Sequence, residues 1–187
     1  LDSKADLLVF GMGEHAVVTT ASRLANEQPL DGIPGTARLL GKNAAEALDT
    51  TDMVELASFA EHKENKDCLL ESIKTLEKQM NPWSGKPIIQ RYGDRLVLME
   101  RPSLPLSTEE MDKVYDLPFA DSPHPIYSEP IPAYETIKDS IPAVRGCPGG
   151  CTFCGLVAHQ GKHLSSRSED SILRTVESFK KKKTFRG

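Results

Sequence analysis

Three of the four cysteines in this 187-residue chain lie within eight residues, at Cys147, Cys151 and Cys154. A protein normally gives a [4Fe–4S] cluster four thiolates, so three thiolates leave one iron free to bind a small molecule. The fourth cysteine, Cys68, is far away in the sequence, and we expect it to be an inert buried thiol. The residue types and their spacing therefore favour an iron–sulfur cluster that has one open iron.

The residues between these cysteines suit a loop that wraps closely around a bulky inorganic cofactor. Gly149 and Gly150 can take positive φ angles, which would let the backbone wrap closely around the cluster. Pro148 stiffens the loop and removes one backbone donor. Phe153 places an aromatic ring beside the third thiolate, where we predict that it shields the cluster from water.

Two other uses of the same thiols remain open from the residues alone. A cytosolic group of cysteines is often a zinc site, in a structural or interaction module, and His159 or His163 would complete a tetrahedral Cys3His set. An electron-transfer iron–sulfur protein is the second alternative, and it would need a fourth ligand. Disulfides are disfavoured because four cysteines in 187 residues are too sparse for a small secreted scaffold.

Further stretches of the sequence carry a family resemblance. They are Gly-Met-Gly-Glu at 11–14, Asp-Leu-Pro-Phe at 116–119, His-Pro at 124–125, Pro-Ala-Tyr-Glu at 132–135, Val-Arg-Gly-Cys at 144–147, His-Gln-Gly at 159–161 and Ser-Arg-Ser at 166–168. With the Cys-x3-Cys-x-aromatic-Cys pattern, they make the chain resemble the YgiQ-type proteins of the radical S-adenosylmethionine (radical SAM) superfamily.

The resemblance implies a function and a set of cofactors. Cys147, Cys151 and Cys154 would hold three irons of a [4Fe–4S] cluster, with Phe153 beside the cofactor, and S-adenosylmethionine would bind the fourth iron. An electron from a donor such as flavodoxin or ferredoxin would then cleave S-adenosylmethionine, giving a 5′-deoxyadenosyl radical that acts on an unknown substrate. No catalytic residue beyond the cluster ligands is assigned.

Composition restricts the partners of the chain. Its formal net charge is −4, which gives no general basis for binding nucleic acid or an anionic membrane surface. No apolar run approaches the ~20 residues that span a bilayer. We expect a cytoplasmic protein that uses small-molecule cofactors.

The predicted fold class is α/β. We expect an N-terminal α/β domain over 1–100, partly Rossmann-like and built from a βα unit, helices and a hairpin. A proline-rich linker over 101–135 and the start of a radical SAM barrel over 136–187 follow. The resemblance implies a (β/α)6 barrel, of which this chain supplies one βα unit, and a fragment that is inactive by itself.

The N-terminal part begins with a short apolar run at 7–10, predicted to be a buried parallel strand. A helix follows from Glu14 and is expected to bury one apolar face. Gly-x-Gly-x-x-Ala at 11–16 formally matches a dinucleotide fingerprint, with Asp31 as the candidate ribose acid. We favour a tight packing turn instead, because no good second strand places Asp31 at its end.

Pattern and capping residues predict the remaining elements. Residues 43–80 are predicted to form two helices, and 87–99 a hairpin with Gly-Asp at its turn. Ser107 and Glu110 form a capping box that opens a short helix. A strand is expected to lead into the cysteine loop at Val144. A second capping box, from Ser166 to Glu169, is predicted to open a helix whose buried residues are Ile172, Leu173, Val176 and Phe179.

Overall fold

A computed structural model of the chain describes residues 3–181. It is mixed α/β, as the sequence predicts, and in the described part it has a five-stranded sheet and a two-stranded ribbon. In chain order the elements are β1 (Leu8–Val9), α1 (Glu14–Ala25), β2 (Thr36–Leu40), α2 (Lys42–Ala47), β3 (Val54–Leu56), α3 (Phe59–Glu64), α4 (Lys66–Gln79), β4 (Ile88–Tyr92), β5 (Arg95–Met99), α5 (Thr108–Tyr115), α6 (Pro132–Ile137), β6 (Val144–Arg145), α7 (Leu156–Gln160), β7 (Ser165–Ser166) and α8 (Glu169–Lys180).

The chain divides into two compact units, which are described separately. Unit 1 takes the residues up to Pro105 together with Cys147–His163, and unit 2 takes Leu106–Gly146 and the residues from Leu164 onward. The stretch Cys147–His163, called the cysteine segment below, therefore belongs to unit 1. The strands that flank it in sequence, β6 and β7, belong to unit 2.

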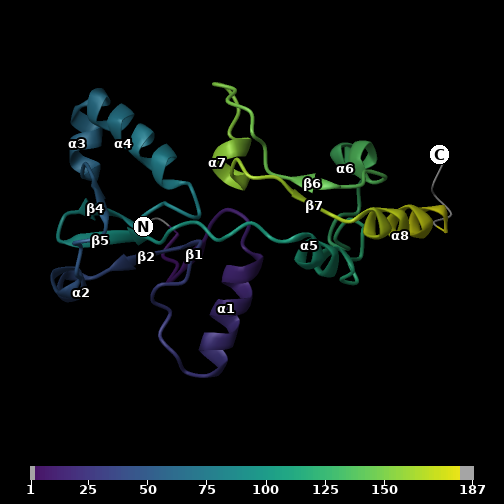
Figure 1. Cartoon of the computed structure of the whole chain (residues 1–187), viewed down its shortest axis with the longest axis horizontal. Helices are drawn as coiled ribbons and strands as arrows, with labels where there is room; N and C mark the ends of the chain where they lie inside the picture. Colours follow the sequence, from purple (N-terminus) through teal and green to yellow (C-terminus); the bar gives the residue numbers. More distant parts are fainter. Residues whose placement is uncertain (1–2, 182–187) are drawn as a thin grey trace. The chain divides into compact units, whose positions relative to one another are not determined.

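The sheet of unit 1 has the order β1-β2-β5-β4-β3 and is mostly antiparallel. The predicted hairpin is confirmed as β4 and β5, and Gly93 at its turn has φ +62°. Parallel strands need a long crossover, and β3 is joined to its parallel neighbour β4 through α3 and α4. Figure 1 shows α3 and α4 on one side of these strands and α2 on the other.

A cluster of buried hydrophobic side chains lies on one face of this sheet. Leu98 and Ile89 are each 1% exposed and stand opposite each other on β5 and β4. Leu96 is equally buried and stands opposite Leu40 on β2. Ala45 of α2 packs against the same cluster. Side chains two residues apart on a strand share a face, so the alternation in β5 places two leucines in this core.

The predicted roles of the first strand and helix are wrong. β1 is antiparallel to β2, and Leu8 and Val9 are 48% and 39% exposed. With two residues and one neighbouring strand, β1 is an edge element whose side chains are partly exposed. On α1 the buried residue is Ala16, and Val18 is 69% exposed. The helix therefore packs through its first turn, and its apolar face stays at the surface.

The glycine turn between β1 and α1 serves packing, as the sequence analysis favours. The first two strands of a dinucleotide-binding unit are parallel, whereas β1 and β2 are antiparallel. The Asp31 carboxylate forms an ion pair with Arg38. Gly11 has φ +70°, and a Cβ on Gly13 would lie 2.7 Å from Val9 Cγ1. Gly11 is thus favoured by the backbone conformation and Gly13 by the nearby Val9 side chain.

Two strands lie where the sequence analysis predicts none. Residues 43–80 form α2, β3, α3 and α4 rather than two helices, and β2 precedes them. The predicted second helix is confirmed as α4. β3 has only three residues, too few to show a period, and its pairing with β4 spans more than 30 residues of sequence. Non-local pairing of this kind leaves no local signal.

In unit 2, serine residues cap the helices α5 and α8, and a side chain of α5 accepts hydrogen bonds from the residue that caps α8. The Ser107 capping box on α5 is confirmed. The second box is wrong, because Ser166 lies in β7 and Ser168 caps α8 instead. Phe179 of α8 is buried as predicted, but Leu173 is 52% exposed. Asp112 of α5 accepts hydrogen bonds from the Ser168 amide (3.0 Å) and hydroxyl (2.5 Å).

We expect the Asp112 contact to make the stability of unit 2 depend on pH. The hydrogen bonds from Ser168 hold the pKa of the Asp112 carboxyl below its usual value, so its stabilising effect is complete above about pH 4 and is lost as the pH falls through the lowered pKa. Asp112→Asn should flatten the acid limb of a plot of melting temperature against pH. An unchanged acid limb in this variant would contradict the assignment.

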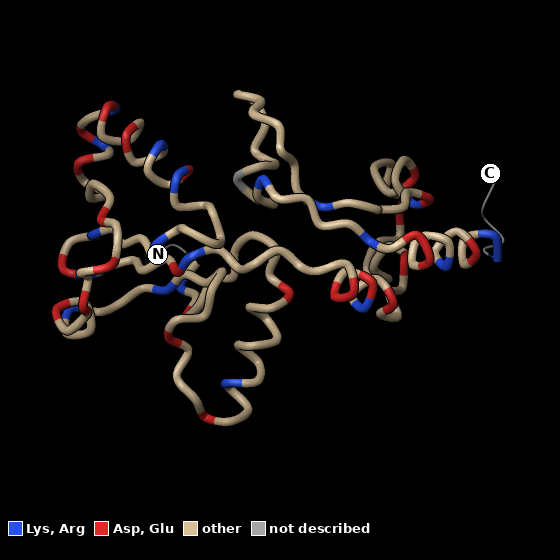
Figure 2. Tube along the Cα trace, in the orientation of Figure 1, with Lys and Arg blue, Asp and Glu red and all other residues tan. Residues whose placement is uncertain are grey.

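Both positive and negative side chains lie along α4, α5 and α8 (Figure 2). The long stretch 146–161, which contains the three clustered cysteines, carries no Lys, Arg, Asp or Glu. No helix of the described residues is both long enough and apolar enough to cross a bilayer.

Candidate metal centre

The cysteine loop begins where a strand ends, as predicted. β6 ends at Arg145, and Gly146 separates it from Cys147. β6 pairs with β7 in an antiparallel ribbon, with Val144 opposite Ser166. Val144 therefore has a partner strand on one side. β7 has two residues and comes directly before a helix, so no pattern in the sequence marks it.

Glycine allows the chain to turn at the two ends of the cysteine loop, and the freedom of Gly149 and Gly150 to take positive φ is not used. Gly146 and Gly161 have φ of +89° and +81°, whereas Gly149 and Gly150 do not have positive φ. The Cys147 amide donates to the Gly161 carbonyl at 3.1 Å and so closes the base of the cysteine segment. Positive φ is needed at the two ends, where the chain reverses, rather than between the cysteines.

Gly149 has a different structural role, which is to leave room between two sulfurs. A Cβ at this position would lie 3.2 Å from Cys147 Sγ and 3.9 Å from Cys151 Sγ. The same construction at Gly150 meets no atom within 4 Å. A side chain at position 149 would therefore occupy the space that a cofactor bound by these two thiols needs.

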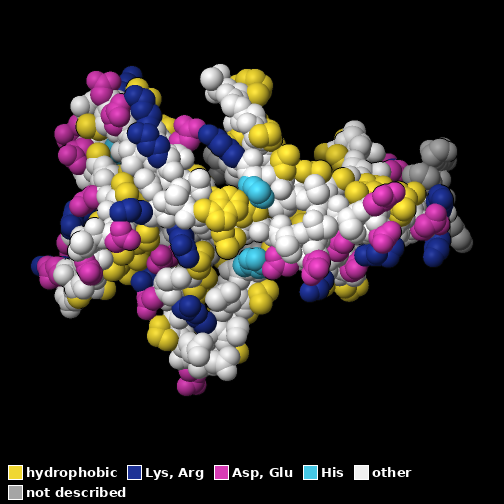
Figure 3. All heavy atoms as spheres, viewed as in Figure 1, with side chains coloured by type: hydrophobic (Ala, Val, Ile, Leu, Met, Phe, Trp, Pro, Cys, Tyr) yellow, Lys and Arg dark blue, Asp and Glu magenta, His cyan; other side chains and the backbone are white. Residues whose placement is uncertain are grey.

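The three clustered cysteines are chemically available. All are free thiols, with Cys147 half-buried and Cys151 and Cys154 exposed. The Cys154 amide donates to the Cys151 carbonyl, so a tight turn joins the last two. Phe153 is 90% exposed, and the role of its ring as a shield stays a prediction. Figure 3 shows hydrophobic side chains at the surface of this loop.

The donor set fits an iron–sulfur cluster in its chemistry. Soft thiolates select iron–sulfur clusters, zinc or copper(I). In the described part of the chain, however, no three Cys, His, Asp or Glu side chains gather closely enough to hold a metal ion. A metal held by all three thiols would therefore require the three sulfurs to move closer together. Among the described residues, the two histidines considered as zinc ligands are not part of such a group either. His159 is exposed, and the His163 ring packs on Trp83.

The far end of the cysteine segment is packed on the body of unit 1. Residues 156–160 form α7, a short helix that the sequence analysis treats as a connector. The His159 carbonyl lies 3.6 Å from the position of a Cβ on Gly11. Lys162 forms an ion pair with Glu77 of α4 at 3.0 Å. Cys68, also on α4, is half-buried and free.

In unit 2, two guanidinium groups lie over one aromatic ring. Arg145 and Arg167 lie 5.3 and 4.3 Å from the centre of the Tyr115 ring. Arg145 Nε also donates to the Tyr115 hydroxyl at 3.3 Å. Arg167 is 5% exposed and donates to the Ser171 carbonyl at 2.7 Å. These contacts fix the strand that leads into the cysteine loop.

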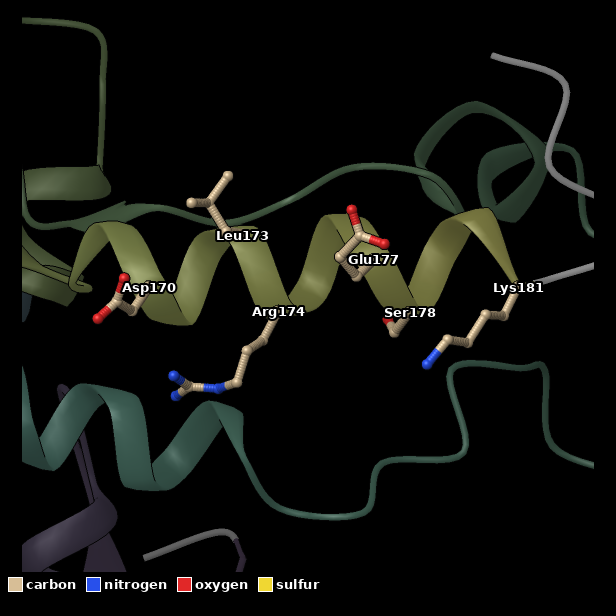
Figure 4. A pocket seen from close by; sticks show the side chains of 6 residues that line it. All are labelled: Asp170, Leu173, Arg174, Glu177, Ser178 and Lys181. Carbon is tan, nitrogen blue, oxygen red and sulfur yellow. The ribbon is translucent and has the colours of Figure 1, made fainter.

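Two cavities of the structure are lined by residues other than the cysteines. A hollow of about 600 Å³ lies along one helix, α8 (Figure 4). Its lining is Asp170, Leu173, Arg174, Glu177, Ser178 and Lys181. A smaller cavity of about 150 Å³ in unit 1 lies between the start of α1 and residues 101–104. Arg174 is paired with Asp116 at 3.0 Å, so its charge is already balanced.

Comparison with curated proteins finds relatives along the whole chain. A UPF0313 protein of Geobacter sulfurreducens is 44% identical over 190 residues, covering 100% of this chain and 31% of the relative. One from Thermotoga maritima is 42% identical over 192 residues, with shares of 100% and 33%. A third, from Methanocella arvoryzae, is 39% identical over 189 residues, with shares of 100% and 31%. The chain thus spans about a third of the length of these relatives.

A family model described as "Radical SAM N-terminal" matches residues 1–140. The match covers unit 1 up to Pro105 and continues into unit 2, and it ends before Cys147. No solved structure matches the chain. Because the matched stretch is well over half of the sequence, the chain belongs to the radical SAM N-terminal family.

Proposed function

We propose that this chain is part of a radical SAM enzyme and that Cys147, Cys151 and Cys154 hold its [4Fe–4S] cluster. The observation that carries the proposal is a group of three free thiols on an uncharged loop that begins at the end of β6. Membership of the radical SAM N-terminal family supports it. S-adenosylmethionine is the proposed second cofactor, and an electron donor of the flavodoxin or ferredoxin class the proposed partner.

The bound cofactors would supply the electron transfer that cleaves S-adenosylmethionine to methionine and a 5′-deoxyadenosyl radical. The chain's own residues supply position and access. The exposed Cys151 and Cys154 leave the site open to a small molecule. The stretch 146–161 has no charged side chains, so no carboxylate within it would repel the negative charge of a thiolate-bound cluster.

We also propose that this chain contains the first unit of the barrel that the family resemblance implies. β6 would be the first strand of a barrel, and the loop after it would lie at the end where barrel enzymes place their chemistry. The proposal keeps the three predicted regions, which are an N-terminal domain over 1–100, a linker over 101–135 and the start of the barrel over 136–187. It also includes a cytoplasmic location, and the substrate is unknown. The activity belongs to the whole protein, and we expect this chain alone to be inactive.

Anaerobic reconstitution tests the proposal. The 187-residue chain is incubated with ferrous iron and sulfide, desalted and analysed for iron, sulfide and zinc, and the reduced sample is examined by EPR. We expect about four irons and four sulfides per chain and the EPR signal of a cubane cluster. Stoichiometric zinc without iron would support the zinc-binding module instead. A cluster that needs a fourth protein ligand would support the electron-transfer protein.

Gly149→Ala should lower cluster occupancy, and Gly150→Ala should not. The added methyl group at position 149 would lie 3.2 Å from Cys147 Sγ, in the space between two ligand sulfurs, whereas at position 150 it meets nothing within 4 Å. Iron content after reconstitution measures the difference. Equal occupancy in these two matched variants would show that the space beside Gly149 is not where the cofactor binds.

A further inference from the structure

Trp83, the single tryptophan of the chain, lies at the surface of unit 1 and contacts the cysteine segment. Its ring and that of His163 are 5.0 Å apart between centroids, at an interplanar angle of 70°. This edge-to-face arrangement is the favourable one for aromatic pairs. Trp83 is 59% exposed, so burial in the core of unit 1 does not explain its position.

The turn that presents Trp83 is closely bonded. The Asn81 side-chain oxygen accepts from the amides of Trp83 (2.9 Å) and Ser84 (3.3 Å). The Gly85 amide donates to the Asn81 carbonyl at 2.7 Å, and a Cβ on Gly85 would collide with the Gln79 carbonyl. This turn follows α4 directly, so it holds the Trp83 backbone in one conformation.

Other contacts reach the same end of the cysteine segment. Lys162, next to His163, pairs with Glu77 of α4, and the His159 carbonyl packs against Gly11. Exposed ion pairs of this kind contribute little. The Trp83 ring contact is therefore the most substantial of the three. The Gly-Met-Gly turn, which a dinucleotide fingerprint would assign to phosphate, lies here beside the His159 carbonyl of α7.

We propose that the turn at 81–86 positions the cysteine segment through the Trp83–His163 contact, and that Trp83 is a positioning residue for the metal centre. This inference rests on the proposed function. Gly161 links His163 to the cysteine loop, because it lies two residues before His163 and its carbonyl accepts a hydrogen bond from the Cys147 amide. Fixing His163 thus fixes the residue that closes the base of the loop. Trp83 does not touch the thiols and acts through that closure.

Hydrogen exchange in the metal-free 187-residue chain tests the positioning directly. Trp83→Ala should speed amide exchange over 159–163 about two- to tenfold, the factor expected from losing one aromatic pair. Trp83→Phe should restore most of the protection, because it keeps an aromatic ring. His163→Ala should have the same effect as Trp83→Ala, and the double variant should add little. Tyr127→Ala, an exposed aromatic at 62% in unit 2, is the matched control.

Reconstitution tests the consequence for the metal centre. Trp83→Ala should lose iron to a chelator about two- to tenfold faster than wild type and should alter the EPR signal of the reduced cluster, while Trp83→Phe and Tyr127→Ala match wild type. Identical exchange over 159–163 in wild type and Trp83→Ala would overturn the inference. So would identical iron loss and EPR signals. If wild type takes up no iron, the proposed function fails, and exchange alone decides whether Trp83 positions the segment.

Discussion

Cys151→Ala is expected to leave the reconstituted chain without a cluster. Cys151 is one of three thiols available as ligands, and a [4Fe–4S] cluster held by only two thiolates is not retained. The variant should show less than about a tenth of the wild-type iron and no EPR signal from a cubane cluster. Because the Cys151 side chain is exposed, the melting temperature of the metal-free chain should not change.

Cys68→Ala is the matched control for this prediction. Cys68 is also a free thiol, but it lies on α4, outside the cysteine segment. Its removal should leave iron, sulfide and the EPR signal at wild-type values. Full iron uptake by Cys151→Ala would contradict the ligand assignment. Loss of iron from both variants would point to a set of ligands that includes Cys68.

The largest expected effect on stability comes from Leu98→Ala. Leu98 is 1% exposed and packs with Ile89, Leu96 and Leu40 in the core of unit 1. Removing its branched end leaves a cavity between central strands, and large-to-small changes of this type cost about 2–5 kcal/mol. Urea unfolding followed by Trp83 fluorescence should show a lower midpoint and a nearly unchanged slope.

Leu70→Ala on α4 removes the same atoms from a side chain that is 50% exposed. Its free energy of unfolding should stay within about 0.5 kcal/mol of wild type, as for most surface substitutions. Leu98→Ala should also weaken iron retention, because the cysteine segment packs on unit 1. Equal midpoints for the two leucine variants would show that the β4–β5 pair is not the centre of the core.

Features that a few neighbouring residues encode can be predicted from the sequence. Gly-Asp between two apolar runs fixes the β4–β5 hairpin, because a two-residue turn sets its own register. Ser107 and Glu110 bond to each other's backbone, so α5 begins where its capping box predicts. The strand before Cys147 and the presence of a helix after residue 168 also follow from local patterns, although Ser168 rather than Ser166 caps that helix. The spacing of the three cysteines is also local, and the family resemblance depends on it.

Only the tertiary structure decided what each apolar run packs against. The apolar run at 7–10 predicts a buried strand. A strand is buried only when it has neighbours on both sides, and β1 has a single neighbouring strand, β2. β3 and β7 have three and two residues, so their strand character comes from β4 and β6, which are distant in sequence. The apolar face of α1 likewise stays at the surface.

The candidate site shows the same division. The residue types at 147, 151 and 154 determine that soft thiolates are available, and this follows from the sequence alone. The tertiary structure decided where glycine is needed, because positive φ occurs at Gly146 and Gly161, where the chain reverses. It also decided that Trp83 contacts His163, since the two are 80 positions apart and their contact forms only once the turn after α4 and the end of the cysteine segment have come together.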